Sequence, residues 1–201
     1  KTIFGPHWLL REIQLTAKPG EANDYLLAGP TIELLKKKAI PELQKALSGL
    51  AVYNQGDRCF RFTAEGSAKV CGRSCQITVF VGYAAKPESL ESATYKAAWL
   101  DEAGQKEFKE GSWEAILRRL TIHQGRVLIT TTPYQLGWLQ KRIYNQDGKG
   151  EVTVIPFESR ENPAYPVEEW NRAQQDLPPY RFDLFYRGIF TKPSGAVFDC
   201  F

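Results

Sequence analysis

An apolar run that ends in two adjacent carboxylates lies near the middle of the chain. Residues 97–100 (Ala-Ala-Trp-Leu) are followed directly by Asp101 and Glu102. Such a run suits a buried parallel strand, and in open α/β sheets ligands bind at the carboxyl ends of the strands. The pattern therefore predicts that both carboxylates lie at a ligand-binding edge of a sheet. The alternative is a pair of acids that opens a surface turn.

A second strand ends in hydroxyl groups about one helix later. Residues 127–129 (Val-Leu-Ile) run into Thr130, Thr131 and Thr132, and Pro133 follows. One interpretation is a β-branched strand end that is stopped by proline. The other is functional, because a polar group on a neighbouring strand can sense a phosphate and shift when that phosphate leaves.

The first two residues match the end of a phosphate-binding loop. Lys1 and Thr2 occupy the last two positions of the pattern G-x-x-x-x-G-K-[ST], and the apolar spacing of residues 3–15 predicts the helix that this loop requires. A helix N-terminus favours phosphate through its dipole and its free N–H groups. We interpret the chain as a fragment that begins inside such a loop.

Strand and helix signals alternate through the rest of the chain. Period-two patterns at 59–63 and 76–81 predict an antiparallel pair joined by a connection that contains Gly and Ser. Thr31 is expected to cap a helix that Pro41 breaks or restarts. Beyond Pro156 the sequence turns to Pro, Asn, Arg and aromatic residues, with helical patterns at 167–176 and 179–186. Residues 25–28 form a short apolar run that Gly29 and Pro30 close, and the other predicted elements are a helix at 113–120 and a strand at 126–130.

Composition narrows the class of protein. With 43% hydrophobic and 24% charged residues the chain of 201 residues is globular, and it holds no apolar run long enough to span a bilayer. A net charge of +3 excludes a polycation and leaves the class of partner open. Four scattered cysteines favour a reducing, intracellular setting with buried thiols, and their spacing does not predict a structural zinc site; they are Cys59, Cys71, Cys75 and Cys200.

Together these motifs resemble the ATPase domain of the large subunit of tailed-phage terminases, the motors that package DNA into preformed capsids. The resemblance covers most of the chain and keeps the family order. It is carried by residues 25–31 (Tyr-Leu-Leu-Ala-Gly-Pro-Thr), 87–94 (Pro-Glu-Ser-Leu-Glu-Ser-Ala-Thr), 99–105 (Trp-Leu-Asp-Glu-Ala-Gly-Gln), 127–136, 186–190 and 195–198.

The resemblance implies a three-layer α/β fold of the P-loop NTPase (ASCE) class, with a mostly parallel sheet and a small helical lid. The implied domains are an ATPase core at 1–156, truncated inside the Walker A loop, a helical lid at 157–191 and a linker at 192–201. That linker leads toward a nuclease domain that lies outside this sequence, so no nuclease activity is expected here.

The resemblance also implies roles for individual residues. Lys1 and Thr2 bind the nucleotide, and Thr2 also contacts magnesium. Asp101 is the Walker B acid that holds Mg²⁺ through water, and Glu102 is the catalytic glutamate that orients the attacking water. Residues 130–132 form the motif that couples hydrolysis to movement. The expected cofactors are ATP and Mg²⁺.

Two groups of basic residues remain open. Some relatives carry an arginine that acts on a neighbouring subunit's nucleotide shortly before the Walker B strand, where this chain has Glu91. Weak candidates for that role are Arg73, Arg118 and Arg119. Four residues around the predicted antiparallel pair are candidates for DNA phosphate contacts or for an ordinary solvated sheet edge; they are Arg58, Arg61, Lys69 and Arg73.

The implied function is ATP hydrolysis that drives translocation of double-stranded viral DNA into a procapsid, in the cytoplasm of the host cell. The implied partners are DNA, the portal protein, the small terminase subunit and further copies of the chain in a ring, without a membrane. Two alternatives stay open. One is a helicase-like P-loop ATPase, and the other is a non-catalytic adaptor domain that binds DNA or the portal.

Overall fold

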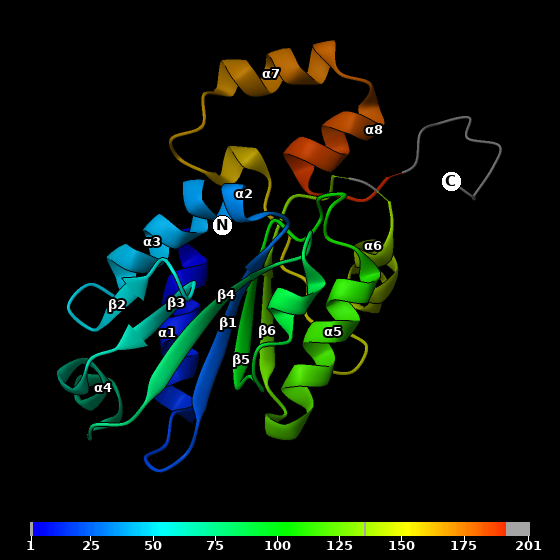
Figure 1. The fold of residues 1–201 in the computed structure, drawn as a ribbon. Coiled ribbons are helices and arrows are strands. Elements are labelled where there is room, and N and C mark those ends of the chain that lie inside the picture. The colour runs from blue at the N-terminus through cyan, green and yellow to red at the C-terminus, as the bar shows by residue number, and fades with distance from the viewer. Residues whose placement is uncertain (1, 135, 192–201) are drawn as a thin grey trace. The chain divides into compact units, whose positions relative to one another are not determined.

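The structure, a computed structural model, describes residues 2–134 and 136–191. The chain forms two compact units, each with its own set of contacts (Figure 1). The first unit contains residues up to 103 together with 107–131, and the second contains 104–106 and the chain from 132 onward. Residues 132–156 therefore pack with the helical unit, whereas the sequence analysis grouped them with the core. In the described part of the chain they contribute no strand to the sheet.

The first unit is built on a six-stranded sheet with the order β2-β3-β4-β1-β5-β6. Four strands are mutually parallel, β4, β1, β5 and β6, and β2 and β3 add an antiparallel extension. The strand bounds are Asn23–Gly29 for β1, Ala51–Asn54 for β2, Cys59–Phe62 for β3, Ile77–Tyr83 for β4, Ala97–Asp101 for β5 and Arg126–Thr130 for β6.

The predicted antiparallel pair is confirmed, because β3 pairs with β4 from Cys59 opposite Phe80 to Arg61 opposite Thr78. The connection between them differs from the prediction, since it contains a helix, α4 (Ala64–Cys71). The Thr63 hydroxyl accepts a hydrogen bond from the Gly66 N–H at 2.9 Å and caps this helix.

Helices cover both faces of the sheet, with α1 and α5 on opposite sides (Figure 1). The strand between them, β5, is buried along its whole length, as a central parallel strand requires. The first unit's helices are α1 (Phe4–Thr16), α2 (Ile32–Lys37), α3 (Ala39–Ala46), α4 and α5 (Glu110–Leu120), with short 3-10 turns at Pro87–Leu90 and Thr121–His123.

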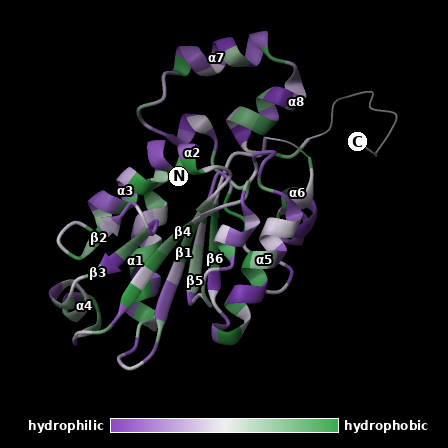
Figure 2. Cartoon of the chain, viewed as in Figure 1, coloured by the Kyte–Doolittle hydropathy of each residue, from purple (hydrophilic) through white to green (hydrophobic). Residues whose placement is uncertain are grey.

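The main hydrophobic core lies between the sheet and the helices α1 and α3, which pack against one of its faces. Leu9 and Ile13 of α1, Leu43 of α3 and Trp99 of β5 are all fully buried in it. Figure 2 shows the matching alternation of hydrophobic and hydrophilic residues around the helices.

The local signals around α2 are also confirmed. The Thr31 hydroxyl accepts a hydrogen bond from the Leu34 N–H at 3.3 Å, which is the expected helix cap. The helix ends at Lys37, and α3 restarts at Ala39 after a kink at Lys38 (φ −125°, ψ −73°). Pro41 explains the kink, because its ring cannot follow an uninterrupted helical turn but is tolerated in the first turn of a new helix.

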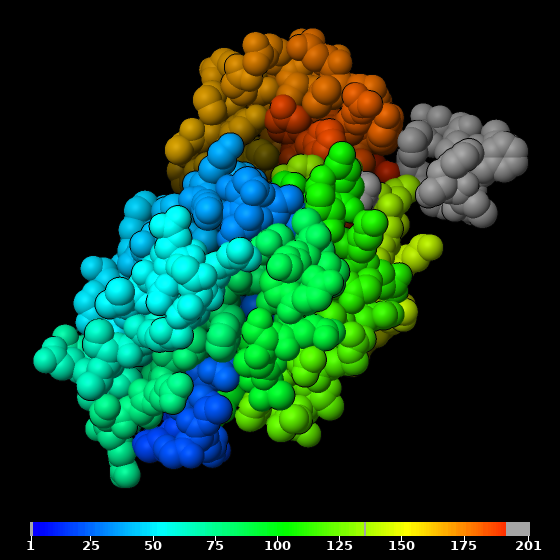
Figure 3. Space-filling view, viewed as in Figure 1, coloured from blue at the N-terminus to red at the C-terminus, as the bar shows by residue number. Residues whose placement is uncertain are grey.

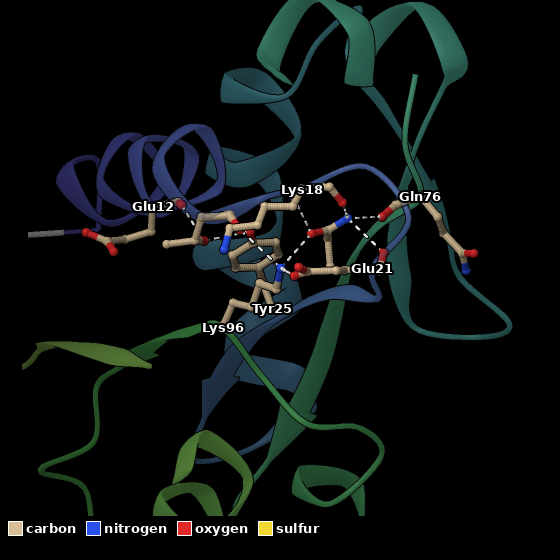
Figure 4. A network of polar contacts seen from close by, with 8 residues as sticks. Glu12, Lys18, Glu21, Tyr25, Gln76 and Lys96 are labelled. Carbon is tan, nitrogen blue, oxygen red and sulfur yellow. Dashed lines mark hydrogen bonds and ion pairs between the residues drawn. The ribbon is translucent and has the colours of Figure 1, made fainter. Parts of the chain in front are cut away.

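A buried lysine ties the amino ends of the strands to the end of α1 (Figure 4). Lys96 is 5% exposed, and its ammonium group donates hydrogen bonds to the Thr16 carbonyl at 3.1 Å and to Asn23 Oδ1 at 2.9 Å. It also pairs with the Glu21 carboxylate at 2.8 Å, which lowers the pKa of Glu21. Asn23 Nδ2 in turn donates to the Gln76 carbonyl at 2.9 Å. The charge is thus paired and hydrogen-bonded, as a buried ammonium must be.

The second unit has a separate, aromatic core. Trp170 and Phe182 pack with ring centroids 4.8 Å apart, and Phe182 stacks on Tyr186 at 5.3 Å. Its helices are α6 (Trp138–Arg142), α7 (Val167–Asp176) and α8 (Pro179–Phe182), with a π-helical turn at Asp183–Arg187 and 3-10 turns at Tyr144–Gln146 and Ser159–Glu161. The sequence predicted one helix over 179–186 where the structure has α8 followed by the π turn.

In the ranges 2–134 and 136–191, no helix combines the length and the apolar character needed to cross a membrane.

Candidate active site

The carboxyl ends of β5 and β6 lie side by side and bring the predicted acids next to a threonine hydroxyl. Asp101 and Thr130 are partners in the parallel pairing of β5 with β6. Thr130 Oγ1 lies 2.8 Å from Asp101 Oδ1 and 2.8 Å from Trp99 Nε1. Because an indole N–H can only donate, the Thr130 oxygen accepts from Trp99 and its proton goes to Asp101. The Asp101 carboxylate is therefore held in one orientation.

The amino end of α1 reaches the same place. Thr2 Oγ1 is 3.5 Å from Asp101 Oδ1, at the outer limit of a hydrogen bond. The approach depends on Gly5, because a Cβ atom at that position would lie 2.0 Å from the Trp99 ring. Glycine thus lets α1 lie directly against β5. Lys1, the other predicted phosphate contact, is outside the described residues.

Burial sets the electrostatics of Asp101. The side chain is 2% exposed, and loss of solvation raises its pKa above the usual value. The hydrogen bond from Thr130 acts in the opposite direction, and the neighbouring charge of Glu102 raises the pKa further. A buried carboxylate of this kind gains stability when a cation binds beside it.

The donor set fits a hard cation. Asp101, Thr2 and Thr130 offer only oxygen atoms, the ligands that Mg²⁺ prefers. Magnesium usually keeps several waters and binds through one or two carboxylates plus substrate phosphates, so a single buried acid with a hydroxyl beside it suffices. In the described part of the chain, no three His, Cys, Asp or Glu side chains are grouped to form an all-protein metal cage.

Glu102 sits at the same edge in an unusual backbone conformation. Its φ is +55°, a left-handed value that is strained in residues other than glycine and that recurs at functional sites. The Glu102 N–H donates to the Thr130 carbonyl at 2.7 Å, which extends the β5–β6 pairing and holds the strained residue in place. The backbone therefore fixes the direction in which the Glu102 side chain projects from the end of β5.

The two oxygens of the Glu102 carboxylate differ. Oε1 lies 3.8 Å from the Lys38 ammonium nitrogen, at the kink between α2 and α3. Oε2 is buried and has no hydrogen-bond partner among the described residues. A buried acceptor without a partner is costly, which indicates that a water or a ligand completes the site.

The structure thus brings together four of the predicted residues: Thr2, Asp101, Glu102 and Thr130. Thr131 follows directly after β6, and Thr132 is the first residue of the second unit's main segment. The coupling role assigned to the three threonines stays a prediction.

The candidate DNA contacts lie apart from this site and are all exposed. Arg61 pairs with Asp57 at 2.8 Å, and Arg58 stacks on the Tyr83 ring at 5.6 Å. Lys69 belongs to α4, and Arg73 follows that helix. The strand β3 is not an edge, because it lies between β2 and β4. Of the two strands, β2 is therefore the one at the edge of the sheet. That the four residues contact DNA stays a prediction.

The arginine candidates differ in their surroundings. Arg118 and Arg119 of α5 both pair with Glu91, at 2.9 Å and 3.2 Å, whereas Arg73 is exposed near α4. Glu91 therefore holds the two α5 arginines within the same chain. A trans-acting role for any of the three stays a prediction.

The cysteines in the described part of the chain are free thiols. Cys59 is buried, Cys71 and Cys75 are half-buried, and Cys200 is outside the described residues. Burial raises the pKa of the Cys71 thiol to about 11, and the contact with Cys75 contributes to the same shift. Burial also raises the pKa of the Cys59 thiol. Burial therefore favours the protonated form of the Cys59 and Cys71 thiols.

Sequence reasoning missed Lys38, Trp99 and Gly5 as parts of the site. Pro41 predicted the break between the helices at which Lys38 lies, but it gave no signal that this lysine reaches Glu102. Trp99 was interpreted as part of a buried strand and of the segment that carries the resemblance, and its indole N–H gave no signal of a partner. Gly5 carried no turn pattern, because it is needed for a close approach rather than for a special φ.

Comparison with solved structures identifies the fold. The large terminase of a thermophilic bacteriophage matches with a TM-score of 0.70 and 14% identity, over 94% of this chain and 44% of that one. The large terminase ATPase domain of Thermus phage P74-26 matches with a TM-score of 0.65 and 17% identity, over 90% of this chain and 81% of that one. The thermophilic bacteriophage protein in complex with ADP matches with a TM-score of 0.70 and 13% identity, again over 94% of this chain and 44% of that one.

These neighbours confirm the predicted fold class, the P-loop NTPase fold of large terminase ATPase domains. The chain spans less than half of the length of the thermophilic bacteriophage protein. No protein-family model matches the chain, and no curated protein sequence does.

Proposed function

We propose that this chain is the ATP-hydrolysing motor domain of a terminase large subunit, and that hydrolysis drives double-stranded DNA into a procapsid. One observation carries the proposal: Thr2, at the amino end of α1, lies 3.5 Å from the buried Asp101, and Glu102 follows Asp101 directly. The neighbours support it, since the large terminase of the thermophilic bacteriophage is described in complexes with ADP and with ATP-gamma-S.

The chain's own residues divide the work at this site. Thr2 and Asp101 would hold Mg²⁺, which when bound would neutralise phosphate charge. Thr130 keeps Asp101 oriented for that task through the 2.8 Å hydrogen bond. Lys1, if it completes the phosphate loop, contacts the β- and γ-phosphates.

Glu102 is the general base in this proposal. Its Oε2 is buried without a partner among the described residues, and it accepts a proton from the attacking water. The water oxygen then forms a bond to the γ-phosphorus, while the bond between that phosphorus and the bridging oxygen breaks and ADP leaves with the electron pair. The products are ADP and inorganic phosphate.

The wider role rests on the likeness to terminases. The proposed partners are duplex DNA, the portal protein, the small terminase subunit and other copies of the chain in a ring. The proposed setting is the cytoplasm of a bacterial host. Movement after hydrolysis would pass from residues 130–132 to the second unit, which is proposed to act as the lid.

The first test is ATP hydrolysis by the full-length protein and its Glu102→Gln variant, with and without linear duplex DNA. We expect Glu102→Gln to lower kcat by at least about 100-fold, because a general base contributes that much or more. Nucleotide affinity, measured with a fluorescent ATP analogue, is expected to change little, since glutamine preserves the shape of the side chain.

Each result separates the candidate functions. Turnover that needs Glu102 and rises with duplex DNA supports a packaging motor. Turnover accompanied by strand separation favours the helicase-like alternative. Salt-dependent DNA binding without turnover, even with procapsids present, favours the adaptor and refutes the ATPase proposal.

A further inference from the structure

The loop between α2 and α3 places a lysine at the acidic end of β5. Lys38 is the only residue between the two helices, and its N–H donates to the carbonyls of Leu34 and Leu35 at 3.1 Å and 3.3 Å. These bonds close the end of α2 and fix the direction in which the next residues leave. The α2–α3 segment lies at the surface of the first unit, in light blue in Figure 3.

The lysine faces one oxygen of the Glu102 carboxylate. Nζ of Lys38 is 3.8 Å from Oε1, and the exposed fractions of the two side chains are 49% and 10%. The ammonium thus remains half in solvent while the carboxylate is almost buried. Such a pair does little for stability, because a solvated lysine loses entropy when it is held in one place.

The pair has a clear geometric effect on the carboxylate. The two oxygens of a carboxylate are equivalent, so the ammonium can hold either one, and in this structure it lies beside Oε1. Oε2 is left buried and without a partner among the described residues. The contact with Lys38 therefore restrains the plane of the carboxylate and leaves one oxygen, Oε2 here, buried and able to accept a proton.

We propose that Lys38 is a positioning residue that holds the Glu102 carboxylate with Oε2 facing the attacking water. This inference rests on the proposed function, since it assigns a helper to the proposed general base. Lys38 touches neither the water nor the phosphate in this role and acts only through Glu102. The pair joins two distant parts of the sequence, since Lys38 lies at the kink between α2 and α3 and Glu102 directly follows β5.

The test is steady-state ATP hydrolysis by the full-length protein, with kcat and KM measured for Lys38→Ala, Lys38→Arg and Glu102→Gln. We expect Lys38→Ala to lower kcat by about 10- to 100-fold with KM changed by less than about two-fold, because misplacement of a reacting group costs rate rather than binding. Lys38→Arg keeps the positive charge and is expected to restore most of the rate.

Lys37→Ala is the matched control, because Lys37 is exposed one residue away at the end of α2. Its kcat is expected to equal that of the wild type. The melting temperature of Lys38→Ala is also expected to be unchanged, which separates a positioning role from general loss of structure.

The double variant Lys38→Ala/Glu102→Gln gives the sharpest readout. If Lys38 acts only through Glu102, the double variant has the same single-turnover rate as Glu102→Gln alone. Independent, multiplied losses would overturn the inference. So would an unchanged or raised kcat in Lys38→Ala, or a change confined to KM, which would place Lys38 on the nucleotide instead.

The two proposals fail in different ways. If Glu102→Gln abolishes turnover while Lys38→Ala does not lower kcat, the positioning role is refuted and the proposed function stands. If the wild-type protein shows no turnover under any condition, the proposed function fails and the role of Lys38 fails with it.

Discussion

At the scale of single residues, the Thr130 hydroxyl is the link that fixes the site. It accepts from the Trp99 indole and donates to Asp101, and all three side chains are buried. No other hydroxyl in the described part of the site makes both bonds. One oxygen atom thus sets the orientation of an acid on the neighbouring strand.

Thr130→Val tests this link because valine has nearly the shape of threonine but no hydroxyl. It removes the acceptor of the buried Trp99 indole N–H and the shorter of the two hydrogen bonds to Asp101 Oδ1. We expect the free energy of unfolding to fall by about 1–3 kcal/mol, measured by urea denaturation. Thr130→Ser keeps the hydroxyl and is the control; equal stabilities of the two variants would contradict the assigned bonds.

Several site residues could be predicted from the sequence, and the reason is local. Asp101, Glu102 and Thr130 directly follow apolar strand runs, so their place at a sheet edge follows from the strand pattern. Lys38 could not be predicted to reach Glu102, because that contact depends on the angle between two helices and on the path of the intervening strands. Such angles are set by packing, which a single sequence does not display.

At the scale of elements, the fit of α1 against β5 depends on the absence of one side chain. A Cβ on Gly5 would lie 2.0 Å from the Trp99 ring, too close for either group to stay in place. We expect Gly5→Ala to lower the free energy of unfolding by about 1–3 kcal/mol, as overpacking of a core does.

Gly111 provides the control for this change. It lies in α5, and a Cβ there would meet no atom within 4 Å. Gly111→Ala is therefore expected to leave stability unchanged or to raise it by up to about 1 kcal/mol through helix propensity. Thermal unfolding of the two variants side by side decides the matter, and equal effects would contradict the close approach of α1.

The Glu91 carboxylate joins the segment before β5 to α5 and makes that junction sensitive to pH. Hydrogen bonds from Arg118 and Arg119 lower the pKa of Glu91 below its usual 4.5. A carboxyl whose pKa is lower in the folded state stabilises the protein above the unfolded-state pKa and loses that effect as the pH falls through the folded-state value.

We therefore expect Glu91→Gln to be less stable than the wild type at neutral pH, with the difference shrinking below about pH 4.5. Chemical denaturation across that range measures it. Glu88→Gln is the control, because Glu88 is exposed in the 3-10 turn that ends just before Glu91. A difference that stays constant with pH would show that Glu91 acts through packing rather than charge.

Helix ends could be predicted from the sequence where a capping or a helix-breaking residue marks them. Thr31 caps α2 and Pro41 ends it, and both signals were visible in the sequence. The helix α4 was missed, although Thr63 and Gly72 mark its two ends, because it is short and interrupts two strands that pair with each other. The period-two patterns before and after α4 were strong, so the weaker helical pattern between them was interpreted as a connection.

At the scale of the whole molecule, the two units have separate hydrophobic cores. Trp170, with Phe182 and Ala173, centres the core of the second unit, and Leu43 belongs to that of the first. We expect Trp170→Ala to speed amide hydrogen exchange in α7 and α8 while the strands β1 and β5 keep their protection, since local stability follows local packing. Leu43→Ala is expected to have the reverse pattern, and uniform acceleration by either variant would contradict the separation.

The alternation of strands and helices was predictable, but the order of the strands in the sheet was not. Strand order depends on which face each connection crosses, and that is decided by contacts between residues far apart in the sequence. The division of the chain was difficult for the same reason. Composition changes near Pro156, whereas contacts change at Thr132, because strand β6 is the last one to join the sheet.

The buried Lys96 has a consequence for how this protein can evolve. A lysine that is conserved at the start of a central strand in an alignment of relatives would suggest a ligand contact. In this structure its ammonium group instead bonds to Thr16, Glu21 and Asn23 of the same chain. Loss of the ammonium would remove one of the two hydrogen bonds to Asn23 Oδ1, and loss of the amide would leave the ammonium with Thr16 and Glu21 alone. We expect positions 23 and 96 to change together among relatives, because either change alone removes the hydrogen bond between them. Where the lysine is kept, the constraint is structural and does not mark a ligand contact.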